Sequence, residues 1–194
     1  MAKKLLDILM ERFGDSVILE THSHVGDDTA IIAPASWREV ALFLRDDPRC
    51  KMNMLADLCG VDRFDQTPRL EVVAHLHSLE LNHRLRIKTR VGDEDCNGAV
   101  VASLVPVWSG ANWFERETFD MFGIRFQDHP DMRRILLYEE FVGHPLRKDY
   151  PAAKTQPLVP YREGEDVLDK LEPFGPDEGM SFGRKHLDYT KEGE

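Results

Sequence analysis

Cysteine is scarce in this chain, and its scarcity bears on two kinds of chemistry. The 194 residues include three cysteines, widely spaced and without a CxxC pair. Three scattered cysteines do not indicate a disulfide framework, and they cannot supply the four thiolates of an ordinary iron–sulfur cluster. A cluster in which histidine replaces some of the cysteines stays open at this point. We expect all three to be small core residues: Cys50, Cys59 and Cys96.

Basic charge and long apolar runs are also scarce. The chain has 25 Lys and Arg against 35 Asp and Glu, a formal charge of −10. This argues against a nucleic-acid-binding protein, because phosphate neutralisation needs a basic surface. No apolar run approaches the roughly 20 residues that span a bilayer, and Asp7, Glu11 and Arg12 interrupt any signal-peptide core. We therefore expect a cytosolic protein that meets the membrane only through partners.

The sequence also lacks the motifs of nucleotide and hydrolase sites. It contains no GxGxxG fingerprint, no P-loop and no GxSxG elbow. Two His-x-His pairs are present, and such a pair on a strand can chelate zinc when further ligands converge on it. We expect His75 and His77 to be half-exposed sheet residues, and His22 and His24 to lie in a solvent loop. A stand-alone His/carboxylate metalloenzyme is kept as an alternative.

Hydrophobic periodicity predicts an α+β fold with an antiparallel or mixed sheet and helices packed on one face. Ser36 and Glu39 form a capping-box pattern that predicts the start of a helix. The last three predicted strands are expected to form an antiparallel meander across a turn near Asn82. The predicted helices are residues 1–13, 37–46 and 51–60, and the predicted strands are residues 17–20, 29–34, 69–80, 85–91 and 99–107.

Residues 113–137 form an unusual segment, WFERETFDMFGIRFQDHPDMRRILL, in which charged and aromatic side chains alternate closely. Such a segment can neither be wholly buried nor remain comfortably in water, so we expect a surface that a partner covers. Asn112 as N-cap and Gly123 as the left-handed terminator predict a helix between them. Arg116 and Asp120, four residues apart, are expected to pair on its exposed face.

Glu115 has two interpretations at this stage. It lies three residues after Asn112, where it would close a capping box, or it is a carboxylate buried against a cation that pairs with it. After the helix, residues 124–126 alternate as a short strand, and Pro130 suits the first turn of a second short helix. The loop GHPLRKDYP follows, with prolines that keep it out of helices and central strands.

The chain divides by composition into two parts. Residues 1–150 carry the predicted α+β domain. Residues 151–194 are rich in Pro and Gly, with apolar residues too thinly spaced to build a core. We expect this second part to be an extended arm that docks on a partner, with a disordered tail as the alternative.

Three ordered motifs, ERETFDMFGIRF, HPDMRRILL and GHPLRKDYP, resemble the family of the 30-kilodalton (C) subunit of respiratory NADH–quinone oxidoreductase, complex I. The resemblance extends backward through VPVWSGANW and EVVAHLHSLELNHRLRIKTRV and covers residues 5–151. It implies a non-catalytic, cofactor-free structural subunit of the peripheral arm, needed for assembly. Catalysis would belong to the assembled, proton-translocating enzyme, whose FMN, iron–sulfur clusters and quinone are expected on other subunits.

The resemblance also implies partners and a location. The expected partners are the 49-kilodalton (D) subunit, beside the quinone site, and other peripheral-arm subunits. The expected location is the cytoplasmic face of the cell membrane. The equivalent subunit of a membrane-bound energy-converting hydrogenase is the nearest alternative. Arginines of the motifs would pair with carboxylates of the neighbour, and Phe119 or Phe122 would fill a pocket there. The predicted interface residues are Glu115, Arg116, Glu117, Phe119, Asp120, Phe122, Gly123, His129, Pro130, Arg133, Arg134, His144, Arg147, Lys148, Asp149 and Tyr150.

Overall fold

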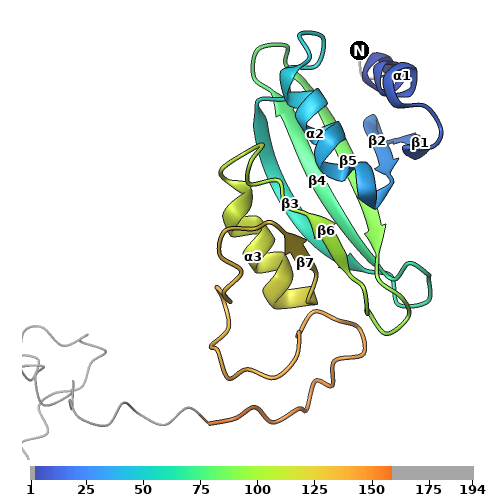
Figure 1. Cartoon of the computed structure of the whole chain (residues 1–194). Helices are drawn as coiled ribbons and strands as arrows, with labels where there is room; N and C mark the ends of the chain where they lie inside the picture. Colours follow the sequence, from blue (N-terminus) through green and yellow to red (C-terminus); the bar gives the residue numbers. More distant parts are fainter. Residues whose placement is uncertain (1–2, 159–194) are drawn as a thin grey trace, which may run out of the picture. The chain divides into compact units, whose positions relative to one another are not determined.

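The computed structural model describes residues 3–158 (Figure 1). Most of the predicted arm, residues 151–194, therefore lies outside the described residues. The part that is described is a mixed α+β fold, as the sequence predicts.

A five-stranded mixed sheet organises the fold, in the order β1-β2-β5-β4-β3. The β2–β5 pair is parallel, and the other neighbours are antiparallel. Figure 1 shows α2 (Trp37–Asp46) lying across one face of this sheet. The strands are β1 (Ile18–His24), β2 (Asp27–Ile32), β3 (Met54–Asp62), β4 (Leu70–Ser78) and β5 (His83–Val91).

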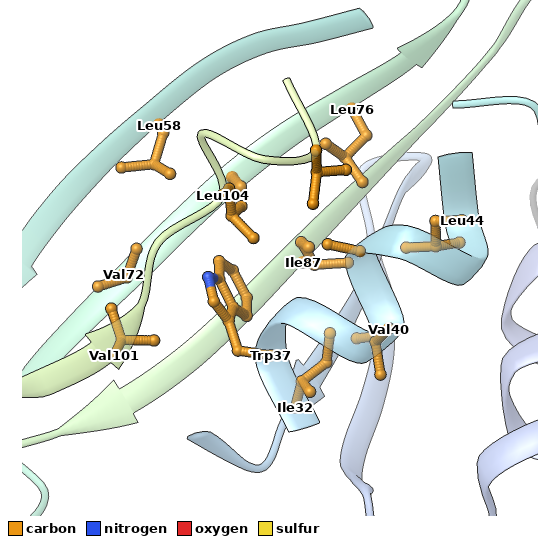
Figure 2. Close-up of a cluster of buried hydrophobic side chains, with 14 of the residues drawn as sticks. Ile32, Trp37, Val40, Leu44, Leu58, Val72, Leu76, Ile87, Val101 and Leu104 are labelled. Atoms are coloured by element: carbon orange, nitrogen blue, oxygen red, sulfur yellow. The ribbon is translucent and has the colours of Figure 1, made fainter. Parts of the chain in front are cut away.

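The core lies between this sheet and α2, and its pattern confirms the predicted faces. Alternate residues of β4, from Leu70 to Leu76, are buried toward the helix. Trp37 at the start of α2 is fully buried, and Figure 2 shows its ring among side chains of the sheet, near Ile87, and of the segment that carries Leu104. Each such side chain contributes about 1.5–3 kcal/mol by burial, so this packing dominates the stability of the fold.

Two predictions for the sheet are wrong. Residues 51–60, predicted as a helix, form most of β3, because the segment pairs with β4 from Met54 to Asp62. Residues 99–107 do not continue the sheet. They contain the short strand β6 (Val100–Ala102), which pairs in parallel with β7 (Arg125–Gln127). The antiparallel meander therefore consists of β3, β4 and β5.

Helices α1 and α2 lie where the sequence predicts them, and one predicted cap does not form. Helix α1 (Lys3–Phe13) ends at Gly14 as predicted, with a left-handed φ of 67°. The capping box at Ser36 does not form, because Ser36 ends a 3-10 turn, η1 (Pro34–Ser36), and its side chain makes no capping bond. All three cysteines are free; Cys50 and Cys96 are buried, and Cys59 is half-buried in β3.

His22 and His24 lie in β1, where the sequence pattern predicts a loop. The turn to β2 is tighter than predicted and is made by Val25 and Gly26, both with positive φ. The hairpin register continues to this turn, with His24 opposite Asp27, so the polar run belongs to the strand. Polar residues can occupy β1 because its outward face is exposed.

Candidate docking surface

The charged segment begins with helix α3 (Ala111–Phe122), which packs mainly on β3. Gly123 ends the helix at φ 77°, as predicted. The N-terminal capping box is wrong, because Gly110 occupies the N-cap and no side chain makes a capping bond. Glu115 is therefore free of that role, and its position in the structure requires another explanation.

Glu115 is fully buried beneath the turn that follows β6. The Ser103 hydroxyl donates to Oε2 at 2.7 Å, and the Leu104 backbone N–H donates to Oε1 at 2.6 Å. The second interpretation from the sequence is right about burial and wrong about the cation, because the hydrogen-bond donors to the carboxylate are the neutral Ser103 hydroxyl and Leu104 N–H. Burial raises the pKa of Glu115 to about 7, although these two hydrogen bonds oppose the shift.

His129 lies beside this carboxylate, with Nε2 3.9 Å from Oε2 of Glu115. The Asp131 backbone N–H donates to Nδ1, so the ring proton resides on Nε2, which faces the Asn112 carbonyl at 3.3 Å. Burial lowers the pKa of His129. The neutral imidazole therefore connects α3 to the chain beyond β7.

Asp120 organises the chain that follows, from inside the protein. Its buried Oδ2 accepts backbone N–H bonds from residues 135, 136 and 137, at 3.2, 2.9 and 2.9 Å. Oδ1 accepts from the Arg134 guanidinium at 2.6 Å. Burial pushes the pKa of Asp120 upward, but these donors outweigh it and the pKa lies below its ordinary value. The predicted surface pair with Arg116 is wrong, because Asp120 is buried and Arg134 is its partner.

Residues 129–158 are called the docking segment here, and further bonds to α3 hold its first part, as far as Arg147. Arg116 donates to the carbonyls of Arg133 and Arg134, and Arg147 donates to the carbonyl of Phe122 at 2.6 Å. Nδ1 of His144 lies 2.9 Å from the Asp120 carbonyl. The segment contains no helix or strand, so the short helix predicted at Pro130 is wrong. Specific polar bonds take the place of regular secondary structure in ordering it.

A buried ion pair attaches the docking segment to the sheet as well. Arg69 binds Asp62 through two hydrogen bonds, at 2.7 and 2.8 Å, and reaches Asp149 at 3.0 Å. The Lys148 backbone N–H also donates to Asp62, at 2.8 Å. The sequence prediction does not include Asp62 or Arg69, since nothing in their local pattern indicates that they meet a loop about 80 residues away.

The docking segment exposes several large apolar side chains among its charged ones. Leu136 is 61% exposed, and Val142 and Leu146 are each 51% exposed. Tyr138 is exposed too, and Trp113 of α3 is 65% exposed. A rigid loop that presents several large apolar side chains to solvent is typical of a surface that another protein covers.

The predicted interface residues divide by burial. Glu115 and Asp120 are inaccessible, so they act only through the residues that they hold. Arg134 is bound inside the chain, whereas the Arg133 side chain is 74% exposed and pairs only with Asp131. The interface itself stays a prediction. The other exposed members are Glu117, Pro130, Lys148 and Asp149, and the half-buried ones are Arg116, Phe119, Phe122, Gly123, His129, His144, Arg147 and Tyr150.

Comparison with known proteins agrees with the family resemblance that the sequence motifs show. Residues 30–156 match the family described as the respiratory-chain NADH dehydrogenase 30 Kd subunit. The chain belongs to this family. It is 45% identical over 167 residues to the second C subunit of the NADH-quinone oxidoreductase of Rhizobium etli, covering 86% of this chain and 80% of that protein. It is 43% identical over 149 residues to the C subunit of the same enzyme from Thiobacillus denitrificans, covering 74% and 73%.

A solved structure of the 30-kilodalton family supports the fold. The trypsin-resistant fragment of Nqo5 superposes with a TM-score of 0.56 at 25% identity, covering 66% of this chain and 98% of that fragment. The resemblance stated from the motifs is therefore confirmed. As a member of the complex I 30-kilodalton family, this chain has other complex I subunits as its partners.

The strand-borne histidines occupy a different part of the molecule. His75 and His77 lie on the face of β4 opposite to α2, as predicted, and line a shallow hollow of about 750 Å³. Burial lowers the pKa of His75, and the positive charge of the nearby Arg86 lowers it further. Within residues 3–158, no three His, Cys, Asp or Glu side chains are grouped so as to hold a metal ion. The helices of the described part include none long and apolar enough to cross a membrane.

Proposed function

We propose that this chain is a non-catalytic, cofactor-free structural subunit of the peripheral arm of proton-translocating NADH–quinone oxidoreductase. In this role it docks on the 49-kilodalton subunit beside the quinone site, at the cytoplasmic face of the membrane, and the complex needs it for assembly. Other subunits carry FMN, the iron–sulfur clusters and quinone. Family membership supports the complex, and the docking segment supports the structural role.

The observation that carries this proposal is the construction of the docking segment. Residues 129–158 have no regular secondary structure, yet Asp120, Arg116 and Asp62 bind them at several points. Ordering a flexible loop during binding costs free energy, about 0.5–1.5 kcal/mol for each immobilised side chain. A loop that is already held by its own chain avoids much of that cost. It can therefore present Leu136 and Leu146 to a partner in a fixed arrangement.

The electrostatic part of the proposal rests on Arg133. Arg116 and Arg134 already bond to carbonyls or to Asp120 within the chain, so they support the segment from behind. Arg133 is exposed, pairs with Asp131 at the surface, and lies three residues before the exposed Leu136 in the sequence. Interfaces favour arginine at such a position, because its planar guanidinium binds carboxylates through two parallel hydrogen bonds. We assign to it a carboxylate of the 49-kilodalton subunit.

Cross-linking of the assembled complex with an amine-reactive reagent tests this docking. Lys148 and Lys154 lie on the docking segment, whereas Lys51, whose side chain is 41% exposed, lies just before β3, at the end away from Asp62. We expect mass spectrometry to find cross-links from Lys148 or Lys154 to the 49-kilodalton subunit. Cross-links to that subunit from Lys51 alone, with none from the segment, would contradict the proposed surface.

A further inference from the structure

β3 is an edge strand with one side unpaired. It has nine residues and pairs only with β4. In the described part of the chain, no backbone group from Met54 to Asp62 hydrogen-bonds to any other segment. Alternate N–H and C=O groups along its outer side therefore point away from the sheet without a protein partner.

This edge lacks the lysine, the proline and the shortness that commonly protect exposed strands. Proteins commonly blunt an edge with lysine, proline or very short strands. The sequence of β3, MLADLCGVD, contains no lysine and no proline, and its single irregularity lies between Leu55 and Asp57. Met54 and Val61 are exposed on it. By contrast β1, at the other edge, exposes a polar run that includes two histidines.

Helix α3 packs against β3 without forming a backbone hydrogen bond to it. The helix packs mainly on this outermost strand, and a Cβ on Gly60 would meet the ring of Phe122 at 2.6 Å. Figure 1 shows α3 alongside β3. A helix with its side chains is about 10–12 Å wide, and strands are spaced about 4.8 Å apart. A helix of that width, seated on the last strand, extends over the position that a sixth strand would occupy.

Two carboxylates lie on either side of this edge. Asp57 is on the face of β3 that α2 does not cover, and Glu117 is exposed on α3. Both are near Cys59. Burial raises the pKa of the Cys59 thiol most, and the charges of Asp57 and Glu117 raise it further. In the described residues neither carboxylate makes an ion pair or a hydrogen bond. An added strand, whose successive side chains point to opposite faces, would place basic residues against both.

We propose that the edge of β3 receives an extended strand of another complex I subunit, carrying basic residues on both of its faces. Backbone hydrogen bonds along Met54–Asp62 give affinity, and Asp57 and Glu117 select the basic side chains. This is the mode of recognition in which a peptide extends an existing sheet. It is a second interface, independent of the docking segment.

Hydrogen exchange tests the added strand directly. The amides of residues 55–61 are measured in the purified full chain and in the assembled complex. About half of them already face β4, and we expect the other half to exchange at least tenfold more slowly in the complex. Equal exchange in both samples at these amides would overturn the proposal, whatever happens in residues 129–158.

Charge and edge variants provide the second test. Val61→Lys places a protecting lysine on the edge, and its matched control is Leu19→Lys on the exposed side of β1. Asp57→Lys with Glu117→Lys removes the selecting charges without breaking an internal bond. We expect Val61→Lys and the double variant to reduce incorporation into the complex at least tenfold while the melting temperature of the purified chain is unchanged. Incorporation equal to that of Leu19→Lys would contradict the proposal, and if Val61→Lys fails to fold, the double variant decides.

Discussion

Glu115 illustrates how a residue can match a local motif and serve another purpose. The Asn112-to-Glu115 spacing predicts a capping box, but the carboxylate turns inward to Ser103 and Leu104. Those donors lie in a turn 11–12 residues earlier, which no local pattern connects to the helix. The chemically unusual residues can be recognised in the sequence, whereas their partners depend on how β6 and α3 pack together.

The raised pKa of Glu115 predicts a pH effect on stability. Because the folded pKa, about 7, exceeds the ordinary value of 4.5, the folded state holds the proton more tightly. Stability is full below about pH 4.5 and declines as the pH rises to about 7, by roughly 3 kcal/mol in total. Glu115→Gln mimics the protonated form and should remove this decline. Urea unfolding of both proteins from pH 4.5 to 8 measures the difference.

An unchanged pH dependence in Glu115→Gln would show that the carboxylate is ionised and satisfied in the folded protein. Histidines with lowered pKa values also titrate in this range and act in the opposite direction. They are present in both proteins, so the difference between the two curves reports Glu115 together with its effect on His129, which lies 3.9 Å away.

Asp120 gives the second prediction at this scale. Asp120→Asn keeps the shape but removes the charge that faces Arg134 and three backbone N–H donors. Breaking a buried, charged hydrogen-bond network costs about 3–5 kcal/mol. We expect a loss of this size in the free energy of unfolding, and faster proteolysis within residues 129–146. Thermal melting and limited proteolysis measure the two effects.

The matched control for Asp120→Asn is Asp131→Asn. Asp131 pairs with Arg133 at the surface, where ion pairs contribute little. We expect its melting temperature and cleavage pattern to match those of the unmodified chain. Equal effects from both variants would mean that Asp120 does not hold the segment.

At the scale of elements, strands β4 and β5 could be predicted and β3 could not. Apolar and polar residues alternate along His83–Val91, and along Leu70–Ser78 with the exception of Val73, which is typical of strands in a half-buried sheet. The β3 sequence has helix-compatible spacing and a glycine that resembles a helix stop. Pairing with β4 decides its structure, and that contact is not local.

Gly60 in β3 permits the close packing of α3. A Cβ there would lie 2.6 Å from the Phe122 ring, whereas a Cβ at Gly110 would meet open space. We expect Gly60→Ala to destabilise the chain by about 1–3 kcal/mol through overpacking. Gly110→Ala, the control, should leave the melting temperature nearly unchanged. A melting temperature for Gly60→Ala equal to that of the control would show that α3 moves away from β3 at little cost.

For the whole molecule, the fold class and the family could be predicted, but the topology could not. The mixed sheet depends on the parallel pairing of β2 with β5, two strands separated by more than 50 residues. Periodicity indicates which residues are buried in a strand, but it does not indicate which strands are neighbours. The charged residues of the segment 113–137 stand out in the sequence, but several of them, including Arg116 and Asp120, bond to the docking segment inside the chain. We propose that the exposed apolar side chains of the docking segment make the contacts with the partner.

The most direct measurement of this account is co-purification of the 49-kilodalton subunit with a variant of the docking segment. Leu136→Ser with Leu146→Ser removes two exposed apolar side chains, each worth about 1.5–3 kcal/mol if a partner buries it. The control, Leu79→Ser with Leu81→Ser, changes two exposed leucines in the turn between β4 and β5. The account predicts unchanged folding of both variants and at least a hundredfold weaker association for the segment variant alone. Association equal to the control would contradict it.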